Sequence, residues 1–229
     1  MKEKVLLAWS GGKDSALALY ELRRAGDYEV TALLTTITRD YDRVCMHGVR
    51  RSLLEQQANA LGLPLETVFI SKNASNDEYE SQMRELLTKH LAAGVRSVAF
   101  GDIFLKEVRA YRQQKLSIID MRGLFPLWKR DTAELARAFI NLGFKAVIAS
   151  ADSRCFQSGC AGKAFDEPFL AGLPPGVDPC GENGEFHSFV YDGPIFSRPI
   201  LHTVGEVILR ENGFCYCDLT PHDNGAHTE

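Results

Sequence analysis

The residues that follow the first apolar run of the chain are of types suited to binding a phosphate. Adjacent glycines let the backbone approach an anion without a Cβ in the way. A strand that breaks into a helix aims N–H groups and the positive end of the helix dipole at one point. A carboxylate here would repel a phosphate unless a cation such as Mg²⁺ lay between them, so Asp14 is the predicted metal ligand. An ordinary glycine turn is the alternative. The predicted phosphate site comprises Ser10, Gly11, Gly12, Lys13, Asp14 and Ser15.

A second reactive stretch lies far along the chain, around a tight-turn signal formed by Asn183 and Gly184. Glu182 precedes the turn. If the following residues alternate as in a strand, Glu185 and His187 project to one face. Two carboxylates and an imidazole around one turn could hold an ammonium ion, deprotonate it or bind a metal. A polar surface hairpin is the alternative.

Strand and helix patterns alternate over the first half of the chain, and a glycine follows the first three predicted helices. This alternation predicts a parallel sheet with helices on both faces. Ser75 and Glu78 form a capping box at the start of one helix, and Gly26 and Gly62 are suited to end two others. The predicted strands are 5–8, 29–37, 65–70 and 97–100, and the predicted helices are 14–25, 47–61, 75–93 and 102–116.

Ligands of such sheets bind beyond the carboxyl ends of the strands. The phosphate-site residues follow the first predicted strand, Thr35 and Thr36 come at the end of the second, and Gly101 and Asp102 follow the fourth. We therefore expect these three segments to converge on one ligand.

A change of pattern divides the chain near Trp128. The run 124–128 is predicted as the last strand of a first domain, 1–128. Seven of the nine prolines lie from Pro168 onward, and regular alternation of helix and strand is lost there. We expect residues 129–229 to form a smaller α+β domain, with a helix beginning after Asp131 and a strand at 146–149. The polar stretch 38–43 is predicted to be a mobile loop, and the tail from Thr220 to be disordered.

Composition limits the classes of function. The 229-residue chain is 45% hydrophobic with a net charge of −4 and has no dense block of Lys and Arg, so it gives no strong nucleic-acid signal. No apolar run approaches the roughly 20 residues that span a bilayer, and the first run is too short for a signal peptide. We therefore expect a cytoplasmic protein without a membrane partner. Six cysteines in a chain of this length favour reduced thiols, with a zinc site as the weaker alternative.

Four basic residues recur every third position along one predicted helix, at Lys106, Arg109, Arg112 and Lys115. Such a stripe keeps to one side of a helix. It is either a solvated face or a contact surface for phosphates or an acidic partner.

The loop from Ser10 to Ser15 resembles the SGGxDS pyrophosphate loop of the N-type ATP pyrophosphatases, which cleave ATP to AMP and pyrophosphate. The order of motifs resembles the diphthine–ammonia ligase family over nearly the whole chain, to about Phe196. The resemblance implies a HUP or Rossmann-like nucleotide domain followed by a domain with a glutamate motif. The motifs that carry it are the loop, 47–54, 101–103, 124–128, 181–186 and 192–194.

This resemblance implies an ATP-dependent, AMP-forming ligase that uses Mg²⁺. A carboxylate would be adenylated with release of pyrophosphate, and ammonia would then displace AMP. The acceptor would be diphthine on elongation factor 2 if the source makes diphthamide, and otherwise a small molecule. Substitution of Glu185 by Gln is expected nearly to stop amide formation. The implied catalytic residues are Lys13, Asp14, Glu182, Glu185 and His187, and the implied substrate contacts are His47, Arg50, Arg109 and Asn183.

The chain departs from the ligases proper, which usually have Glu-Gly-Gly-Glu followed by an aromatic and another acidic residue. Asn183 and His187 stand at two of those places, and Asp102 stands where many members have alanine. These differences resemble a bacterial branch that has been linked to corrinoid metabolism. A tRNA-modifying enzyme with the same loop and a non-catalytic ATP sensor are the alternatives, and a homodimer is left open.

Overall fold

Five parallel strands form the centre of the computed structural model, which describes residues 1–156 and 159–222. β1 Glu3–Ala8 lies between β2 Tyr28–Thr38 and β5 Ser97–Ala99, with β6 Arg122–Leu124 beyond β5 and β4 Leu65–Ile70 beyond β2. The short β3 Arg43–Val44 pairs antiparallel with the end of β2. The strand order 4-2-1-5-6 places successive elements on either side of β1, as the alternating pattern predicts.

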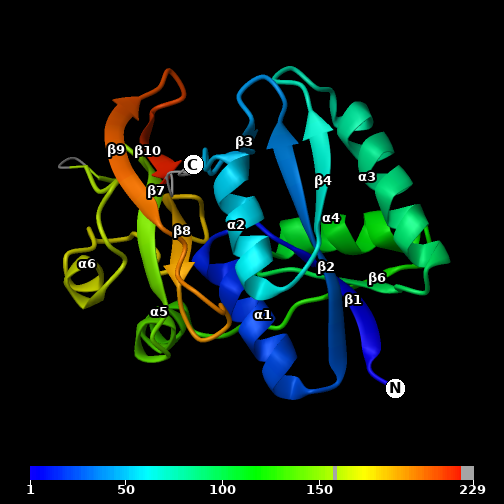
Figure 1. Ribbon diagram of the computed structural model, residues 1–229. Helices are drawn as coiled ribbons and strands as arrows, with labels where there is room; N and C mark the ends of the chain where they lie inside the picture. Colours follow the sequence, from blue (N-terminus) through cyan, green and yellow to red (C-terminus); the bar gives the residue numbers. More distant parts are fainter. Residues whose placement is uncertain (157–158, 223–229) are drawn as a thin grey trace, which may run out of the picture.

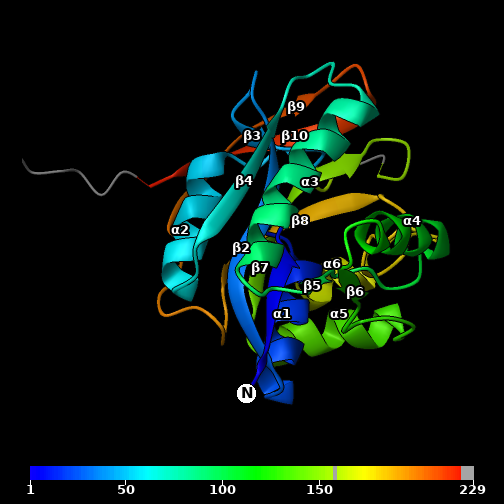
Figure 2. The ribbon, with the colours of Figure 1, turned by 90° about the vertical axis from the view of Figure 1, so that its right-hand side faces the viewer.

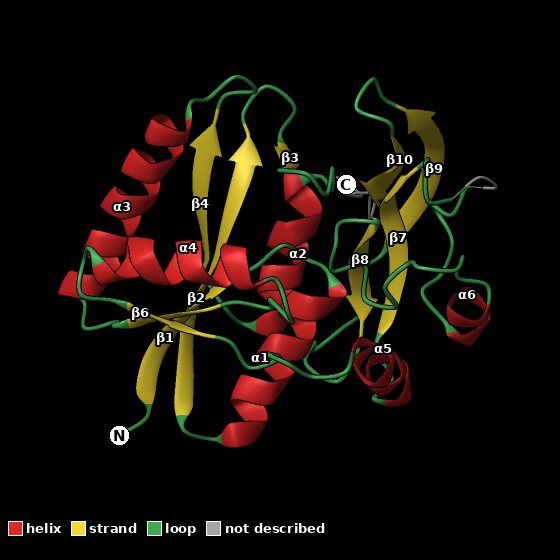
Figure 3. Cartoon of the chain, turned by 180° about the vertical axis from the view of Figure 1, so that it is seen from behind, coloured by secondary structure: helices red, strands yellow, loops and turns green. Residues whose placement is uncertain are grey.

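Helices cover both faces of this sheet, which confirms the predicted fold class. α1 Lys13–Ala25 and α2 Arg51–Leu61 lie on one face, and α3 Asn76–Ala92 and α4 Lys106–Ser117 lie on the other (Figure 3). Successive side chains of β1 point to opposite faces of the sheet, because side chains alternate along a strand. Leu7 joins the core on the α1 side and Leu6 the core on the α3 side.

The second half of the chain builds a separate antiparallel sheet in the order β8-β7-β10-β9. Helices α5 Thr132–Asn141 and α6 Glu167–Ala171 accompany it. Figure 1 shows α1 and α2 between the two sheets and β9 on the outside. Figure 2, turned by 90°, shows α3 in front of the first sheet. The core on the α1 side runs continuously from the first sheet through α1 and α2 into the second sheet. The strands are β7 Lys145–Asp152, β8 Phe186–Asp192, β9 His202–Leu209 and β10 Phe214–Pro221.

Predicted helix ends are confirmed by the caps. Gly26 and Gly62 adopt the left-handed conformation that ends α1 and α2. Ser75 accepts a hydrogen bond from the backbone of Glu78 at the start of α3, and Asp131 does the same for α5. These local signals position the helices on which the site depends.

Several predicted boundaries are wrong. The second helix begins at Arg51 rather than residue 47, because positive φ angles at Met46 and Gly48 turn the chain back on itself first. Residues 39–42 form a turn between β2 and β3, and the predicted mobility of the stretch 38–43 stays a prediction. The last strand of the first sheet ends at Leu124, and a turn occupies 126–129.

At the C-terminal end, Pro221 belongs to β10, so the predicted disorder does not begin at Thr220. Residues 223–229 lie outside the described part of the chain. The division into 1–128 and 129–229 stays a prediction. No helix among the described residues is long and apolar enough to cross a membrane.

Candidate active site

A cavity of about 670 Å³ opens at the carboxyl ends of β1, β2 and β5, where the turn before β8 closes one wall. The structure brings together there most of the residues that the sequence singles out. Gly11, Gly12, Lys13, Arg50, Arg109 and Glu185 are not among the lining residues. The predicted residues that line the cavity are Ser10, Asp14, Ser15, Thr35, Thr36, His47, Gly101, Asp102, Glu182, Asn183 and His187.

The loop after β1 is held in an open turn by its own side chains. Ser15 donates its hydroxyl to the carbonyl of Gly12 at 2.8 Å, and the Gly12 amide donates to Ser10 Oγ at 3.3 Å. Gly11 has a φ of +78°, a conformation that suits glycine. The loop therefore leads directly into α1, whose first-turn amides lack helical partners and suit an anion.

Gln57 on α2 fixes this loop from behind. The side chain is fully buried, and its Oε1 accepts a hydrogen bond from Trp9 Nε1 at 2.8 Å. Its amide nitrogen donates to the carbonyls of Gly11 at 3.0 Å and Val190 at 2.6 Å. A Cβ on Gly11 would lie 2.8 Å from Gln57 Oε1, so the close approach of α2 requires glycine there. Sequence reasoning missed Gln57, whose only signal is a polar residue within the apolar face of a helix.

Strand β8 of the second sheet forms hydrogen bonds with the loop. The Lys13 amide donates to Ser188 Oγ at 3.1 Å, and the Val190 amide donates to the carbonyl of Gly11 at 2.9 Å. A Cβ on Gly12 would lie 3.0 Å from the carbonyl oxygen of Ser188. The second sheet thus contacts the loop that the sequence predicts to bind phosphate.

Lys13 is 2% exposed and is held by other groups of the site. Its Nζ lies 2.9 Å from Asp14 Oδ2 and donates to the carbonyl of Cys180. Burial disfavours the charge of Lys13, but Asp14, Cys180 and Glu182 outweigh burial and raise the pKa of Lys13. Burial raises the pKa of Asp14 despite the neighbouring lysine. Binding of an anion in the loop would give Lys13 a new partner.

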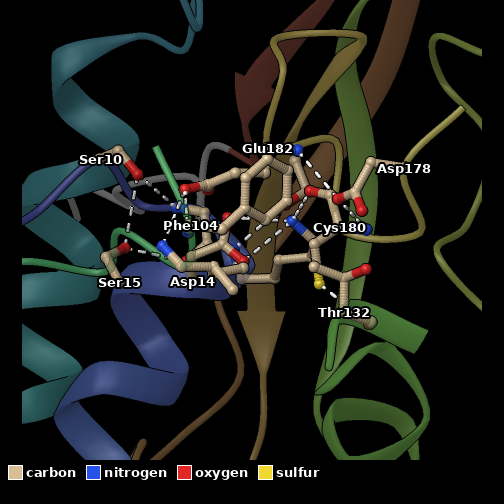
Figure 4. Close-up of polar contacts among 12 residues, drawn as sticks. Ser10, Asp14, Ser15, Phe104, Thr132, Asp178, Cys180 and Glu182 are labelled. Carbon is tan, nitrogen blue, oxygen red and sulfur yellow. Dashed lines mark hydrogen bonds and ion pairs between the residues drawn. The ribbon is translucent and has the colours of Figure 1, made fainter. Parts of the chain in front are cut away.

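Glu182 belongs to the second half of the chain and lines the cavity. Figure 4 shows it beside Phe104, whose amide donates to it. Its Oε1 accepts hydrogen bonds from the amides of Ile103 at 2.7 Å and Phe104 at 3.2 Å. Burial raises the pKa of Glu182, and the charges of Asp14 and Asp102 add to that increase. The site therefore favours a cation beside Glu182.

Asp102 lines the cavity and is paired with Arg112 of α4. Their closest atoms, Arg112 Nε and Asp102 Oδ2, are 2.8 Å apart, and the guanidinium lies 4.3 Å from the centre of the Phe100 ring. Burial raises the pKa of Asp102, while Arg112 opposes that shift. Gly101 packs so closely on α1 that a Cβ would lie 2.8 Å from the backbone carbon of Asp14.

Glu185 is 8% exposed and supports the turn rather than lining the cavity. Its Oε1 accepts hydrogen bonds from the Asp178 amide at 3.0 Å and Asn183 Nδ2 at 2.9 Å. The turn itself closes between the carbonyl of Gly181 and the amide of Gly184. Sequence reasoning missed Asp178, whose Oδ1 accepts from the amide of Glu182 at 3.1 Å and so helps to aim that residue.

Two imidazoles meet at the cavity wall. The ring centres of His47 and His187 are 4.3 Å apart, with 32° between the ring planes. Burial lowers the pKa of His47 well below its usual value, with His187 and Lys13 contributing. Burial, followed by Lys13, lowers the pKa of His187 to about 4. Both rings are therefore neutral near pH 7.

Two predicted substrate contacts are engaged elsewhere. Arg50 binds Asp218 of β10 through two hydrogen bonds of 3.0 and 2.8 Å. Arg109 stacks on Phe125 and Trp128, with its guanidinium 4.7 and 4.4 Å from their ring centres. Their role as substrate contacts stays a prediction. Asp218, which also binds Arg43 at 2.7 Å, was not singled out by the sequence.

The donor groups of the cavity suit a nucleotide with an accompanying cation. The hydroxyls of Ser10, Ser15, Thr35 and Thr36 line the cavity, and a largely apolar recess lies between α3 and α4. The hydroxyl of Thr35 is buried and has no hydrogen-bond partner in the described part of the chain. Among the described residues, no group of three His, Cys, Asp or Glu side chains is arranged to hold a metal ion. The carboxylates of Asp14 and Asp102 line the cavity, and carboxylate oxygens are the kind of ligand that Mg²⁺ takes.

The fold and the site define an α/β protein with a glycine-containing loop and a cavity at the carboxyl edge of its parallel sheet. A family model described as the diphthamide synthase N-terminal domain matches residues 1–119. A second, described as the diphthamide synthase C-terminal domain, matches residues 131–219. The chain belongs to the diphthamide synthase family, which confirms the resemblance found in the motifs.

Several curated relatives of the chain carry the name diphthine–ammonia ligase. The chain is 25% identical over 222 residues to the diphthine–ammonia ligase of Homo sapiens, with 87% of this chain and 83% of that protein covered. It is 27% identical to the diphthine–ammonia ligase of Danio rerio, covering 89% and 88% of the two chains. The diphthine–ammonia ligase of Schizosaccharomyces pombe is 26% identical over 93% of this chain, which spans only 38% of the yeast protein.

Among solved structures, a predicted subunit of a tRNA methyltransferase from Methanocaldococcus jannaschii is 19% identical with a TM-score of 0.42. The match covers 64% of this chain and 78% of that one.

Proposed function

We propose that this chain is an ATP-dependent ligase that forms an amide from a carboxylate and ammonia, as the names of its relatives suggest. The observation that carries the proposal is the meeting of two sites in one cavity. The loop after β1 offers an anion site, and Glu182 offers a half-buried carboxylate at the same cavity. The loop would hold the phosphates, and Glu182 would hold the nitrogen nucleophile.

The phosphates of ATP would bind at the loop from Ser10 to Ser15. Backbone amides at the start of α1 and the ammonium group of Lys13 would stabilise the charge that grows on departing pyrophosphate. Thr35, Thr36 and Gly101 line the cavity nearby and would contact the nucleoside. The acceptor carboxylate would attack the α-phosphorus, so that AMP rather than ADP is the second product.

Mg²⁺ would be held by Asp14 and by phosphate oxygens, with Asp102 close by. When bound, the ion would neutralise phosphate charge during the transfer. The protein contributes the orientation of Asp14, whose backbone packs against Gly101. Release of Asp14 from Lys13 would free both groups for the ion and the phosphates.

Amide formation would take place beside the turn at 181–184. Glu182 lines the cavity and would hold ammonium by charge. Glu185 instead accepts hydrogen bonds from the Asp178 amide and the Asn183 side chain, so we assign it a positioning role. Attack of the nitrogen on the activated carboxyl group forms the C–N bond and breaks the bond to AMP.

The acceptor would present its carboxylate near Asn183 and His187, which line the cavity and differ from the usual family residues. Two acceptors are proposed. One is diphthine on elongation factor 2, and the other is a small carboxylate such as a corrinoid with free carboxyl side chains. A tRNA-modifying enzyme and an ATP sensor are the alternatives, and a sensor would bind ATP without releasing pyrophosphate.

The test is incubation of the purified chain with ATP, Mg²⁺, ¹⁵N-ammonium and each acceptor in turn. Mass spectrometry should show ¹⁵N in a new amide on one of them, and omission of ATP should abolish it. ATP binding without any amide on either acceptor would contradict the ligase and favour the sensor.

A further inference from the structure

Strand β9 forms one edge of the second sheet. It pairs with β10, and no other strand among the described residues pairs with it. Figure 1 shows β9 on the outer side of that sheet. An edge strand presents a row of backbone N–H and C=O groups that can pair with a strand of another chain.

The second half of β9 exposes a run of large apolar side chains. Val207 is 46% exposed, Ile208 is 38% exposed and Leu209 is 62% exposed. Edge strands of monomeric proteins usually carry charges or proline that prevent pairing with another chain. A run of exposed apolar residues indicates instead a surface that another protein covers.

The backbone of this run is oriented for pairing. The Arg210 amide donates to the carbonyl of Phe214 at 2.9 Å, so the polar backbone groups of Arg210 face β10. Backbone groups of successive residues in an antiparallel strand point to alternate sides. The pairing with β10 is regular from Val207 to Leu209. The N–H and C=O groups of Leu209 and Val207 therefore point away from β10, toward the edge.

Charged residues of opposite sign flank the apolar run. Glu206 precedes it, Arg210 follows it, and both side chains are exposed. If two copies pair antiparallel about a two-fold axis at Ile208, Glu206 of each copy lies opposite Arg210 of the other. Val207 then lies opposite Leu209, and the outward backbone groups of these two residues face each other. Opposite charges and apolar pairs directly across two strands stabilise a sheet.

Other registers lose part of this match. Shifting one strand by two residues moves the axis to Val207 or to Leu209 and places Glu206 or Arg210 opposite the apolar Ile208. Shifting by one residue opposes outward with inward backbone groups, so the hydrogen bonds between the strands are lost. The sequence of the edge is therefore complementary to itself in one register.

We propose that the chain forms a symmetric dimer in which β9 pairs with β9 of a second copy, with Ile208 on the two-fold axis. The pairing joins two four-stranded sheets into one continuous sheet. Each copy contributes the same segment, as a two-fold interface requires. None of the described residues of β9 lines the cavity, so the dimer is independent of the proposed function.

The oligomeric state of the intact chain tests the proposal. Sedimentation velocity at increasing protein concentration should show a change from monomer to dimer. Glu206→Arg and Arg210→Glu each place like charges opposite each other twice, so each should weaken dimerisation by about tenfold or more. Glu85→Arg is the control, because it reverses an exposed charge on α3, on the far side of the molecule from β9 (Figure 1). It should leave dimerisation unchanged.

A mixture of the two variants tests the register. In a heterodimer of Glu206→Arg with Arg210→Glu, every charge at position 206 again faces an opposite charge at position 210. The mixture should dimerise about as tightly as wild type, although neither variant does so alone. Thermal melts of the separate variants show whether each is folded. Folded variants whose mixture stays monomeric would overturn the proposed register.

Two other outcomes would contradict the dimer through β9. In the first, wild type stays monomeric at every concentration. If removal of residues 223–229 then produces the dimer, that tail covers the edge in the intact chain in place of a second copy. In the second, wild type, Glu206→Arg and Arg210→Glu dimerise equally, which would show that another surface joins the copies.

Discussion

At the scale of single residues, Lys13 is the group on which the proposed phosphate site depends. Its ammonium is buried and bonded to Asp14 and to the carbonyl of Cys180. This arrangement keeps a positive charge in place at the loop before any ligand arrives. The ligand-free protein therefore already carries the free-energy cost of desolvating Lys13, so binding of a phosphate would not add this cost.

Substitution of Lys13 by Ala should weaken ATP binding by roughly 10- to 100-fold, because charge-assisted hydrogen bonds contribute about 1.5–3 kcal/mol. Isothermal titration calorimetry would measure the change in Kd. Lys106→Ala provides the control, since Lys106 is exposed on α4. An unchanged Kd in Lys13→Ala would disprove the assignment of the loop.

Glu182 and Glu185 should respond differently to the loss of charge. Glu182→Gln removes the carboxylate that lines the cavity and should raise the KM for ammonium while ATP binding is retained. Glu185→Gln alters a group that holds the turn and should mainly lower thermal stability, by about 1–3 kcal/mol of unfolding free energy. Steady-state kinetics and thermal melts separate the two. A large kinetic effect of Glu185→Gln at unchanged stability would support its original assignment as a catalytic residue.

The sequence predicts which residue types gather at the site but not how each side chain points. The spacing identified the segments that contribute to the cavity, among them Ser10, Thr35 and Asp102. It placed Glu185 beside His187 because the two alternate along a strand. The structure turns Glu185 toward Asp178 instead, since the Asp178 amide and the Asn183 side chain donate to its carboxylate.

At the scale of elements, α2 acts as a support for the loop through Gln57. Gln57→Leu would leave Trp9 Nε1 and the carbonyls of Gly11 and Val190 without their buried partner. The free energy of unfolding should fall by about 2–3 kcal/mol, and ATP binding should weaken because the loop loosens. Chemical denaturation and calorimetry would measure both effects.

Gln56→Leu is the matched control, because Gln56 is the neighbouring residue on α2 and is only partly buried. It should leave both quantities nearly unchanged. Equal stability of Gln57→Leu and Gln56→Leu would contradict the supporting role of α2.

Helices with capping signals could be predicted closely, whereas short strands could not. Ser75 and Asp131 mark helix starts through local hydrogen bonds that are written in the sequence. The two-residue β3 has no periodicity to detect, and its pairing with β2 delays α2 to Arg51. The order of the antiparallel sheet depends on pairings between distant segments, which local patterns do not encode.

At the scale of the whole molecule, Asp218 joins the two sheets. Its carboxylate on β10 binds Arg43 of β3 and Arg50 at the start of α2. Hydrogen bonding to Arg50, followed by Arg43, lowers the pKa of Asp218 to about 2. The two arginines thus favour the ionised form in the folded protein.

Asp218→Asn should lower the free energy of unfolding by about 1 kcal/mol at neutral pH, allowing for the partial exposure of the groups. A lowered pKa stabilises the fold above the ordinary carboxyl pKa of about 3.9. That contribution is lost as pH falls toward about 2. Denaturation at several pH values should therefore show the difference from wild type shrinking in acid. A difference that is constant with pH would contradict the role of this ion pair.

The meeting of two distant halves in one cavity could be inferred only through the resemblance of the motifs. Local patterns predict the first sheet and its loop, but they do not show that β8 and its preceding turn complete the site. Ser188 and Val190 form hydrogen bonds with the loop that no pattern in the sequence predicts.

The products of ATP test the central claim most directly. Phosphorus NMR of the chain incubated with ATP, Mg²⁺, ammonium and each acceptor distinguishes cleavage at the α-phosphorus from cleavage at the γ-phosphorus. The account predicts AMP and pyrophosphate, formed by wild type and strongly reduced in Lys13→Ala. Formation of ADP and inorganic phosphate by wild type would contradict it.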